Sequence, residues 1–213
     1  MKTNDMIALL AANIEPVDPG ASARRFAGAL LLGALGSAVA MGMLFGVRPD
    51  ISAWLSTPLF WARLAFPACI AAAGLSMVVR LSHPGVSAGR GWQLLAISLA
   101  LAWMAAAGTL MVATPSERLS LLLGATWQVC SFNIAFLTIP TFIGVIWAIR
   151  GLAPTRLRSA GAAAGVLASA IATMLYCLHC PEMAVSFWAV WYVAGMALAV
   201  GAGAMLGPVL LRW

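Results

Sequence analysis

Long runs of apolar residues, nearly free of charge, fill most of the sequence and constrain its fold more than any other feature. A helix that crosses the hydrocarbon core of a bilayer needs about 20 mostly apolar residues. Runs of this kind cover residues 26–46, 60–79, 92–113, 130–149, 160–178 and 187–211. Only 8% of all residues are charged, against about 25% in soluble domains. The sequence therefore predicts an all-α, polytopic membrane bundle of six transmembrane helices.

The apolar stretch around the fourth run is longer than one untilted helix needs. It extends over residues 119–149, whereas about 20 residues cross a bilayer. We therefore expect residues 119–129 to form an interfacial or re-entrant approach to the span at residues 130–149. The chain then divides into an N-terminal segment, residues 1–25, and a transmembrane domain, residues 26–213.

Basic residues concentrate on one side of the predicted membrane. When the gaps between spans are assigned alternately to two sides, one side holds nine of the twelve Lys and Arg residues, namely Lys2, Arg24, Arg25, Arg80, Arg90, Arg150, Arg156, Arg158 and Arg212. Because loops rich in Lys and Arg remain in the cytoplasm, both termini are predicted to be cytoplasmic. Single, scattered Arg residues are typical of topology determinants, so we expect no direct binding of nucleic acid.

The sequence lacks the residue patterns of an enzyme. His83 and His179 fall on opposite predicted faces of the membrane, so they cannot share one site. No glycine-rich phosphate loop, pair of carboxylates or His-Glu-x-x-His metal motif occurs. We therefore expect neither catalysis nor a bound cofactor.

Charged residues are almost absent from the predicted spans. Arg63 is the only one, about one turn from the outer end of the second span, and we expect its side chain to snorkel to the interface. A buried contact with Glu182 is the alternative. No Asp or Glu lies at mid-membrane, where ion-coupled transporters usually place ionisable groups. A small transporter or a scaffold protein of the membrane is nevertheless kept as an alternative function.

The cysteines are the most informative polar residues. Cys130 begins the fourth span, and Cys177 and Cys180 end the fifth, so the predicted topology brings all three to the outer face. In bacteria the compartment beyond that face is oxidising and permits disulfides. Cys69 lies in the middle of the second span and is expected to be a small packing residue.

Residues 177–180 form a Cys-x-x-Cys pattern, which is formally a redox or metal motif. It lacks the βαβ context of a thioredoxin, and a metal site built from Cys130, Cys177, His179 and Cys180 is not demanded by the spacing. Two interpretations stay open: thiols packed at a helix end, or a functional thiol pair. Two features support the second interpretation: His179 can lower the pKa of the Cys180 thiol, and the acidic Glu182 follows.

The N-terminal segment is predicted to contain a short helix with one apolar stripe. Met6, Ile7, Leu10 and Ile14 recur at helical spacing, with Leu9 beside them. A helix this short is marginal alone in water, so its stripe needs a surface to cover. The membrane, the protein's own helices and the groove of a cytoplasmic partner are the three candidates.

Small and aromatic residues give weaker signals about packing. Glycines four residues apart permit close approach of helices in lipid, although such pairs also arise by chance in a chain this rich in Gly; they are Gly42 and Gly46, Gly161 and Gly165, and Gly203 and Gly207. Aromatic residues near the predicted outer boundary are expected to anchor in the interface; they are Trp54, Trp61, Trp188, Trp191 and Tyr192.

Four stretches of the sequence resemble the NrsF-type membrane anti-sigma factors, and the resemblance runs the full length of the chain. They are Thr3–Val17; Arg150–Arg156; His179-Cys180-Pro181-Glu182 with Trp191, Tyr192 and Gly195; and Gly207-Pro208 with Leu211–Trp213. The resemblance implies a negative regulator that holds an extracytoplasmic-function (ECF) sigma factor at the inner membrane and releases it on oxidative or heavy-metal stress.

The resemblance also implies roles for particular residues. The paired cysteines of the family match Cys130 and Cys180, whereas Cys69 and Cys177 do not belong to the pattern. The implied partners are a cytoplasmic ECF sigma factor and membrane lipid. Together with the helical stripe, this makes Ile7, Leu9, Leu10 and Ile14 the expected sigma-binding residues, and Cys130 and Cys180 the expected redox- or metal-sensing pair.

Overall fold

The computed structural model describes residues 3–12, 18 and 20–212, and the secondary structure of that part of the chain is entirely helical. Its elements are α1 (Thr3–Ala12), α2 (Ala21–Leu44), α3 (Ile51–Leu55), α4 (Pro58–Leu81), α5 (Gly91–Val112), α6 (Pro115–Leu123), α7 (Trp127–Arg150), α8 (Leu157–Tyr176) and α9 (Val185–Leu210). Six helical stretches are long and apolar enough to cross a membrane, which confirms the predicted six-helix bundle.

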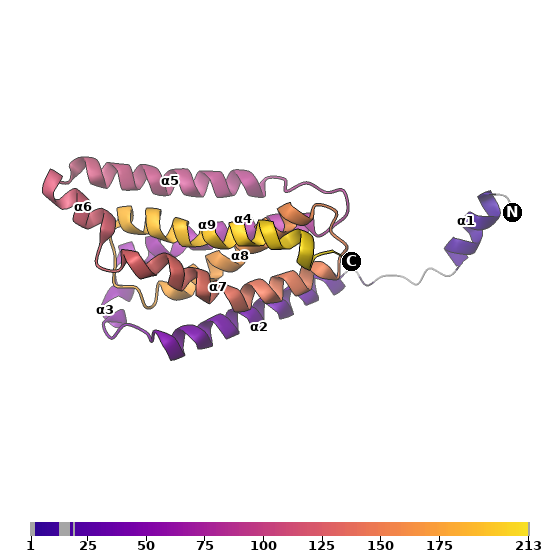
Figure 1. Cartoon of the computed structure of the whole chain (residues 1–213), viewed down its shortest axis with the longest axis horizontal. Helices are drawn as coiled ribbons and strands as arrows, with labels where there is room; N and C mark the ends of the chain where they lie inside the picture. Colours follow the sequence, from indigo (N-terminus) through magenta and orange to yellow (C-terminus); the bar gives the residue numbers. More distant parts are fainter. Residues whose placement is uncertain (1–2, 13–17, 19, 213) are drawn as a thin grey trace.

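The long helices lie lengthwise beside one another (Figure 1). One end of the bundle, called here the cysteine end, carries α3, α6 and the α8–α9 loop, residues 177–184. The start of α2 and the end of α9 lie at the opposite end. This arrangement follows from short connections between consecutive spans, which force neighbouring helices to run antiparallel.

The approach to the fourth span differs from the prediction in its position. A separate helix, α6, covers Pro115–Leu123, and α7 begins at Trp127, three residues before the expected start. The first turn of α6 is fixed by a capping box, in which Thr114 and Glu117 satisfy each other's main-chain N–H groups. Gly124 then adopts a positive φ of 56°, a conformation that favours glycine and that separates the two helices.

Helix α8 occupies the centre of the bundle because its side chains are small. Its sequence is rich in Ala and Gly, and it packs against α2, α4, α7 and α9. Without large side chains the neighbouring backbones come close, so that a methyl group added at Gly74 of α4 would lie 2.8 Å from the main-chain nitrogen of Leu167 in α8. Close packing of small residues is the main attraction between helices in lipid.

The closest helix contact joins α8 to α9. A Cβ atom built on Gly161 would lie 2.1 Å from the carbonyl oxygen of Gly203, and one built on Gly207 would lie 2.4 Å from the carbonyl oxygen of Leu157. The glycine spacing therefore marks a real packing face in these two helices. The pair Gly42 and Gly46 has no neighbour within 4 Å at either position, so there the same spacing marks no contact.

Two of the aromatic residues expected to anchor in the interface belong to the core instead. Trp188 and Tyr192 are buried in α9, whereas Trp61 is 53% exposed and fits the prediction. The expectation was wrong for the first two because sequence position gives depth in the membrane but not the face of the helix.

We predict that Gly203→Ala lowers the stability of the bundle by about 1–3 kcal/mol, as expected for overpacking of a filled interface. The added methyl group would lie 2.2 Å from the carbonyl oxygen of Gly161, so α8 and α9 must separate. Thermal unfolding in detergent measures the change. The matched control is Gly201→Ala in the same helix, where no atom lies within 4 Å; equal unfolding temperatures for the two variants would contradict the prediction.

Candidate functional site

The fold brings the two predicted sensor cysteines together at the cysteine end. Cys130 lies in the first turn of α7, and Cys180 lies in the α8–α9 loop. Their thiols are within hydrogen-bonding reach of each other, and both side chains are completely buried. The antiparallel α7–α8 pair returns the chain to the depth at which it started, which is why residues 50 positions apart meet.

The other two cysteines differ from each other in position. Cys177 is buried one turn before Cys180, beside the same cluster. Cys69 is exposed on the surface of α4, so it is not the packed residue that the sequence suggested. The structure thus gathers three thiols and leaves the fourth outside.

Arg63 of α4 is the centre of this site, and its side chain is 0% exposed. The prediction that it snorkels to the interface was wrong, because its guanidinium turns inward to the α8–α9 loop. It donates four hydrogen bonds there: Nη1 to the carbonyl oxygen of Glu182 (2.9 Å) and to Sδ of Met183 (3.2 Å), and Nη2 to the carbonyl oxygens of Cys177 (3.2 Å) and Cys180 (3.0 Å).

Glu182 contacts Arg63 through its main chain and not through its carboxylate. Oε1 of Glu182 accepts a hydrogen bond of 2.7 Å from the main-chain N–H of Ala125. This bond ties the α8–α9 loop to the turn between α6 and α7. The Glu182 carboxylate therefore helps to fix the position of the loop.

The α2–α3 connection holds the same loop from another side. The main-chain N–H of Arg48 bonds the carbonyl oxygen of Leu178 (3.1 Å), and its Nη1 reaches the carbonyl oxygen of Cys180 (3.4 Å). Asp50 orients this guanidinium through a 2.7 Å ion pair. Hydrogen bonds from Arg48 and then from Trp54 hold the pKa of the Asp50 carboxyl well below its usual range, so the pair stays charged at neutral pH.

His179 does not take the part that its sequence position suggested. Its Nδ1 lies 3.0 Å from the carbonyl oxygen of Gly46, and its ring packs against Phe45 and Tyr176. The pKa of the Cys180 thiol is lowered, first by the hydrogen bond from the Cys130 thiol and then by the positive charge of Arg63. The positive charge that lowers this pKa comes from Arg63.

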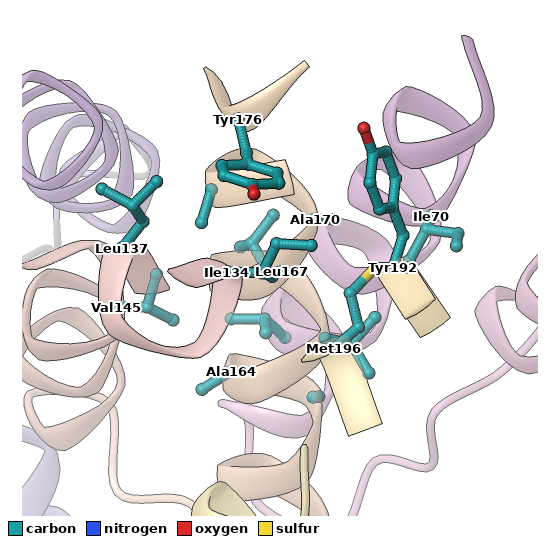
Figure 2. Packing of buried hydrophobic residues seen from close by; sticks show 14 of the residues in the cluster. Ile70, Ile134, Leu137, Val145, Ala164, Leu167, Ala170, Tyr176, Tyr192 and Met196 are labelled. Carbon is teal, nitrogen blue, oxygen red and sulfur yellow. The ribbon is translucent and has the colours of Figure 1, made fainter. Parts of the chain in front are cut away.

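Two tyrosines close the site against the apolar core. The rings of Tyr176 and Tyr192 are 6.1 Å apart in an edge-on arrangement. Figure 2 shows both tyrosines among the residues of the packed apolar cluster. Tyr192 also lies under Arg63, whose Cζ is 5.5 Å from the ring centroid, within the range of a cation–π contact.

The described residues contain no group of three or more His, Cys, Asp or Glu side chains placed to hold a metal ion. The four-ligand site considered from the spacing is thus not assembled in this arrangement. Two thiols can act as soft ligands, so metal binding by Cys130 and Cys180, whose thiols lie within reach of each other, stays a prediction.

The N-terminal candidates are only partly described. Helix α1 covers Thr3–Ala12, which confirms the predicted short helix. The apolar side chains of Ile7 and Leu9 are 58% and 61% exposed on it. The side chain of Leu10 and the whole of Ile14 lie outside the described residues, so the far part of the stripe stays a prediction.

Comparison with known proteins identifies the family. Residues 10–213 match the family model described as "Negative regulator of sigma F". The chain belongs to the NrsF family. The probable anti-sigma-F factor NrsF of Azospira oryzae is 43% identical over 215 residues, and the anti-sigma-F factor NrsF of Caulobacter vibrioides is 37% identical over 220 residues; each alignment covers 100% of both chains. No solved structure matches the chain significantly.

In this NrsF-family chain, the sequence predicted the cysteine cluster but missed its surroundings. Arg63 and Tyr192 were assigned to the interface, although both are completely buried beside the thiols. The signal for Arg63 was present, because an ionisable residue inside a span is by default a candidate for function. For Tyr192 no sequence signal distinguishes a buried from an interfacial position.

Proposed function

We propose that this protein is an anti-sigma factor of the bacterial inner membrane that binds an ECF sigma factor through its cytoplasmic N-terminal segment, residues 1–25. It releases the sigma factor when Cys130 and Cys180 are oxidised or bind a heavy-metal ion. The observation that carries the proposal is the meeting of these two thiols in a chain whose relatives are named anti-sigma-F factors.

The input is a change in the bond between α7 and the α8–α9 loop. A disulfide or a bridging metal fixes the two sulfur atoms at a defined distance, whereas two thiols are free to separate. Because both side chains are completely buried, the reagent must reach them through a transient opening of the loop. The site is therefore suited to a two-state response, in which modification stabilises one of two arrangements.

Helices α7 and α2 offer a route from the cysteine end to the opposite end. Ser37 of α2 donates a 2.8 Å hydrogen bond to the carbonyl oxygen of Leu137 in α7. At the far end of α7, Arg25 of α2 bonds the carbonyl oxygen of Trp147 (2.8 Å) and stacks on its ring. A shift of α7 caused at Cys130 would thus move the start of α2, to which the N-terminal segment is joined.

The output is the apolar face of α1. Met6, Ile7 and Leu9 form one part of the apolar stripe and are exposed on α1. The stripe therefore needs another surface to cover it. An amphipathic helix that inserts into a hydrophobic groove is a common mode of protein recognition. Because the relatives are named anti-sigma-F factors, we infer that the protein with this groove is a sigma factor.

For the orientation, we predict that reporter fusions after Arg25, Gly85 and Ala153 all report the cytoplasm. These positions belong to the side that holds nine of the twelve Lys and Arg residues, and basic loops are retained there. Paired enzymatic reporters, one active only in the cytoplasm and one only in the periplasm, measure the side. A periplasmic result at any two positions would exclude the model with both termini inside.

For the output, we predict that Leu9→Ala weakens sigma-factor binding about fivefold or more, since truncation of a central anchor costs about 1 kcal/mol or more. Ile7→Ala is expected to act in the same direction, and the same expectation extends to Leu10 and Ile14. Co-purification of the sigma factor with the membrane protein measures binding. Ala8→Ser, between the anchors, is the control, and undiminished binding after deletion of residues 2–15 would refute this assignment.

For the input, we predict that Cys130→Ser and Cys180→Ser each abolish induction of a sigma-dependent reporter by an oxidant or heavy metal while repression persists. Each substitution removes one half of the bridge, so neither thiol suffices alone. Non-reducing electrophoresis of the oxidised protein should show an internal crosslink that both variants lose. Cys69→Ser, which alters an exposed thiol outside the cluster, should respond like the unmodified protein; normal induction in both sensor variants would refute the proposal.

A further inference from the structure

We propose that the bundle binds one anionic phospholipid near the end opposite the cysteine end. One acyl chain occupies a cavity between α5, α8 and α9, and the phosphate lies beside exposed arginines at the ends of these helices. Arg90 and Arg158 are the expected phosphate-binding residues. The inference does not depend on the proposed function, because neither the thiols nor a sigma factor takes part in it.

The cavity is apolar and large enough for part of a ligand. Its volume is about 390 Å³, which is within the usual range of ligand pockets. Its walls include Leu95 of α5, Val166 of α8 and Val200 of α9. The polar residue of the lining is Ser169, whose hydroxyl donates a 2.6 Å hydrogen bond to the carbonyl oxygen of Gly165. Because that hydroxyl is already satisfied, the cavity suits a hydrocarbon chain better than a polar ligand.

The packing of the surrounding helices keeps this space open. Helices α8 and α9 meet at backbone contact, since a Cβ atom built on Gly165 would lie 2.6 Å from the carbonyl oxygen of Ala199. Helix α5 packs mainly against α4 and α9. Two walls of the cavity are therefore fixed to each other and cannot move in to fill the space beside α5. An unfilled cavity lacks packing contacts on its lining, and an acyl chain would supply them.

The cavity opens to the surface of the bundle. Ala197 and Gly201, which line it on α9, are exposed. They belong to a helix long and apolar enough to cross a membrane, so the medium at this opening is the hydrocarbon of the bilayer. Lipid tails are as apolar as the cavity wall, so a tail that enters gains packing contacts but no hydrophobic free energy. The selectivity of the site must therefore come from the headgroup.

The helix ends nearest the cavity carry positive charge. The start of α5 and the end of α9 lie at the same end of the bundle (Figure 1), and α8 begins there too, because its Leu157 contacts Gly207 of α9. Arg90, Arg158 and Arg212 are exposed at these helix ends and form ion pairs with none of the residues that the structure describes. Basic sites between membrane helices bind the headgroups of anionic lipids, so this charge favours an anionic lipid over a zwitterionic one.

Negative charge is absent from the connections that carry two of these arginines. Residues 82–90 and 151–158 contain no Asp or Glu. A phosphate placed beside Arg90 or Arg158 would therefore meet no repulsion from a carboxylate in the same connection. The charge of these connections is complementary to an anionic headgroup.

The distances allow one lipid to reach both features. At 1.5 Å per residue, Arg158 lies about 12 Å along α8 from Val166, and Arg90 lies about 8 Å before Leu95. Ser169 follows Arg158 by about three turns and so lies on the same face of α8. Half of the hydrocarbon core of a bilayer is about 15 Å deep, which is the depth that an acyl chain spans from its headgroup. A phospholipid with its phosphate at these arginines thus extends its chain to the cavity.

An acidic surface of a protein partner would also be attracted to these arginines. It would leave the apolar cavity unexplained, because a water-soluble partner does not reach the hydrocarbon depth at which Val166 and Gly201 lie. A phospholipid accounts for the charge and the cavity together, since it carries both a phosphate and a chain.

The test measures lipid binding to the purified full-length protein by native mass spectrometry, with dioleoylphosphatidylglycerol as the anionic probe and dioleoylphosphatidylcholine as the zwitterionic one. We expect the first phosphatidylglycerol to bind at least fivefold more tightly than phosphatidylcholine. Gly201→Leu should weaken phosphatidylglycerol binding at least fivefold, because no atom lies within 4 Å of a Cβ there and the new side chain enters the cavity. The matched control is Gly42→Leu, at an equally open position outside the cavity lining, which should bind like the parent.

The headgroup contact is tested with the same two lipids. Arg158→Gln and Arg90→Gln should each weaken phosphatidylglycerol binding about fivefold, the factor expected for loss of one basic residue beside an anionic lipid. Binding of phosphatidylcholine should not change. Arg118→Gln, which alters an exposed arginine of α6 at the cysteine end, is the control and should bind both lipids like the parent.

Three results would overturn the proposal: equal affinities for the two lipids, parent affinity in Gly201→Leu, or unchanged phosphatidylglycerol binding in both Arg158→Gln and Arg90→Gln. If the arginine variants lose co-purification of a sigma factor but keep phosphatidylglycerol binding, the arginines belong to a protein interface and the lipid site is refuted. If Gly201→Leu does not fold, Ala197→Leu on the same wall decides by the same criterion.

Discussion

Hydrogen bonds from one buried guanidinium to a single loop organise the cysteine end of this membrane protein. Arg63 reaches from α4 to three carbonyl oxygens of the α8–α9 loop, those of Cys177, Cys180 and Glu182. Carbonyl groups in a loop have no helical partners, and in an apolar environment each must find a donor. The Arg63 side chain supplies donors to three of these carbonyl groups, which stabilises the loop at the end of the bundle.

The position of the loop in turn decides where the thiols lie. Cys180 reaches the start of α7, and hence Cys130, because the loop folds back over α4 instead of extending from the bundle. The α2–α3 connection through Arg48 and the α6–α7 turn through Ala125 fix it from two further directions. Four separate parts of the chain therefore meet at one short loop. A chemical change that moves this loop can displace the elements that contact it.

The small residues of α8 give the bundle a rigid centre around which such a change can act. Where Gly161 meets Gly203, the two backbones are too close to admit even a methyl group. A contact of this kind fixes α8 against α9, so movement is expected at other contacts. Helix α7 lies outside the fixed pair of α8 and α9. It carries Cys130 near one end and Trp147, which binds Arg25 of α2, near the other.

The sequence by itself determined the helical class, the six spans within a few residues, and the return of Cys130 and Cys180 to the same end of the bundle. These follow from the length of the apolar runs and from the alternation of direction between consecutive spans, both of which are local properties. The tertiary structure alone decided which face of each helix turns inward. Arg63 and Tyr192 lie at depths where a polar side chain can reach either water or the core, and only the packing of α4 and α9 against the α8–α9 loop selects the core.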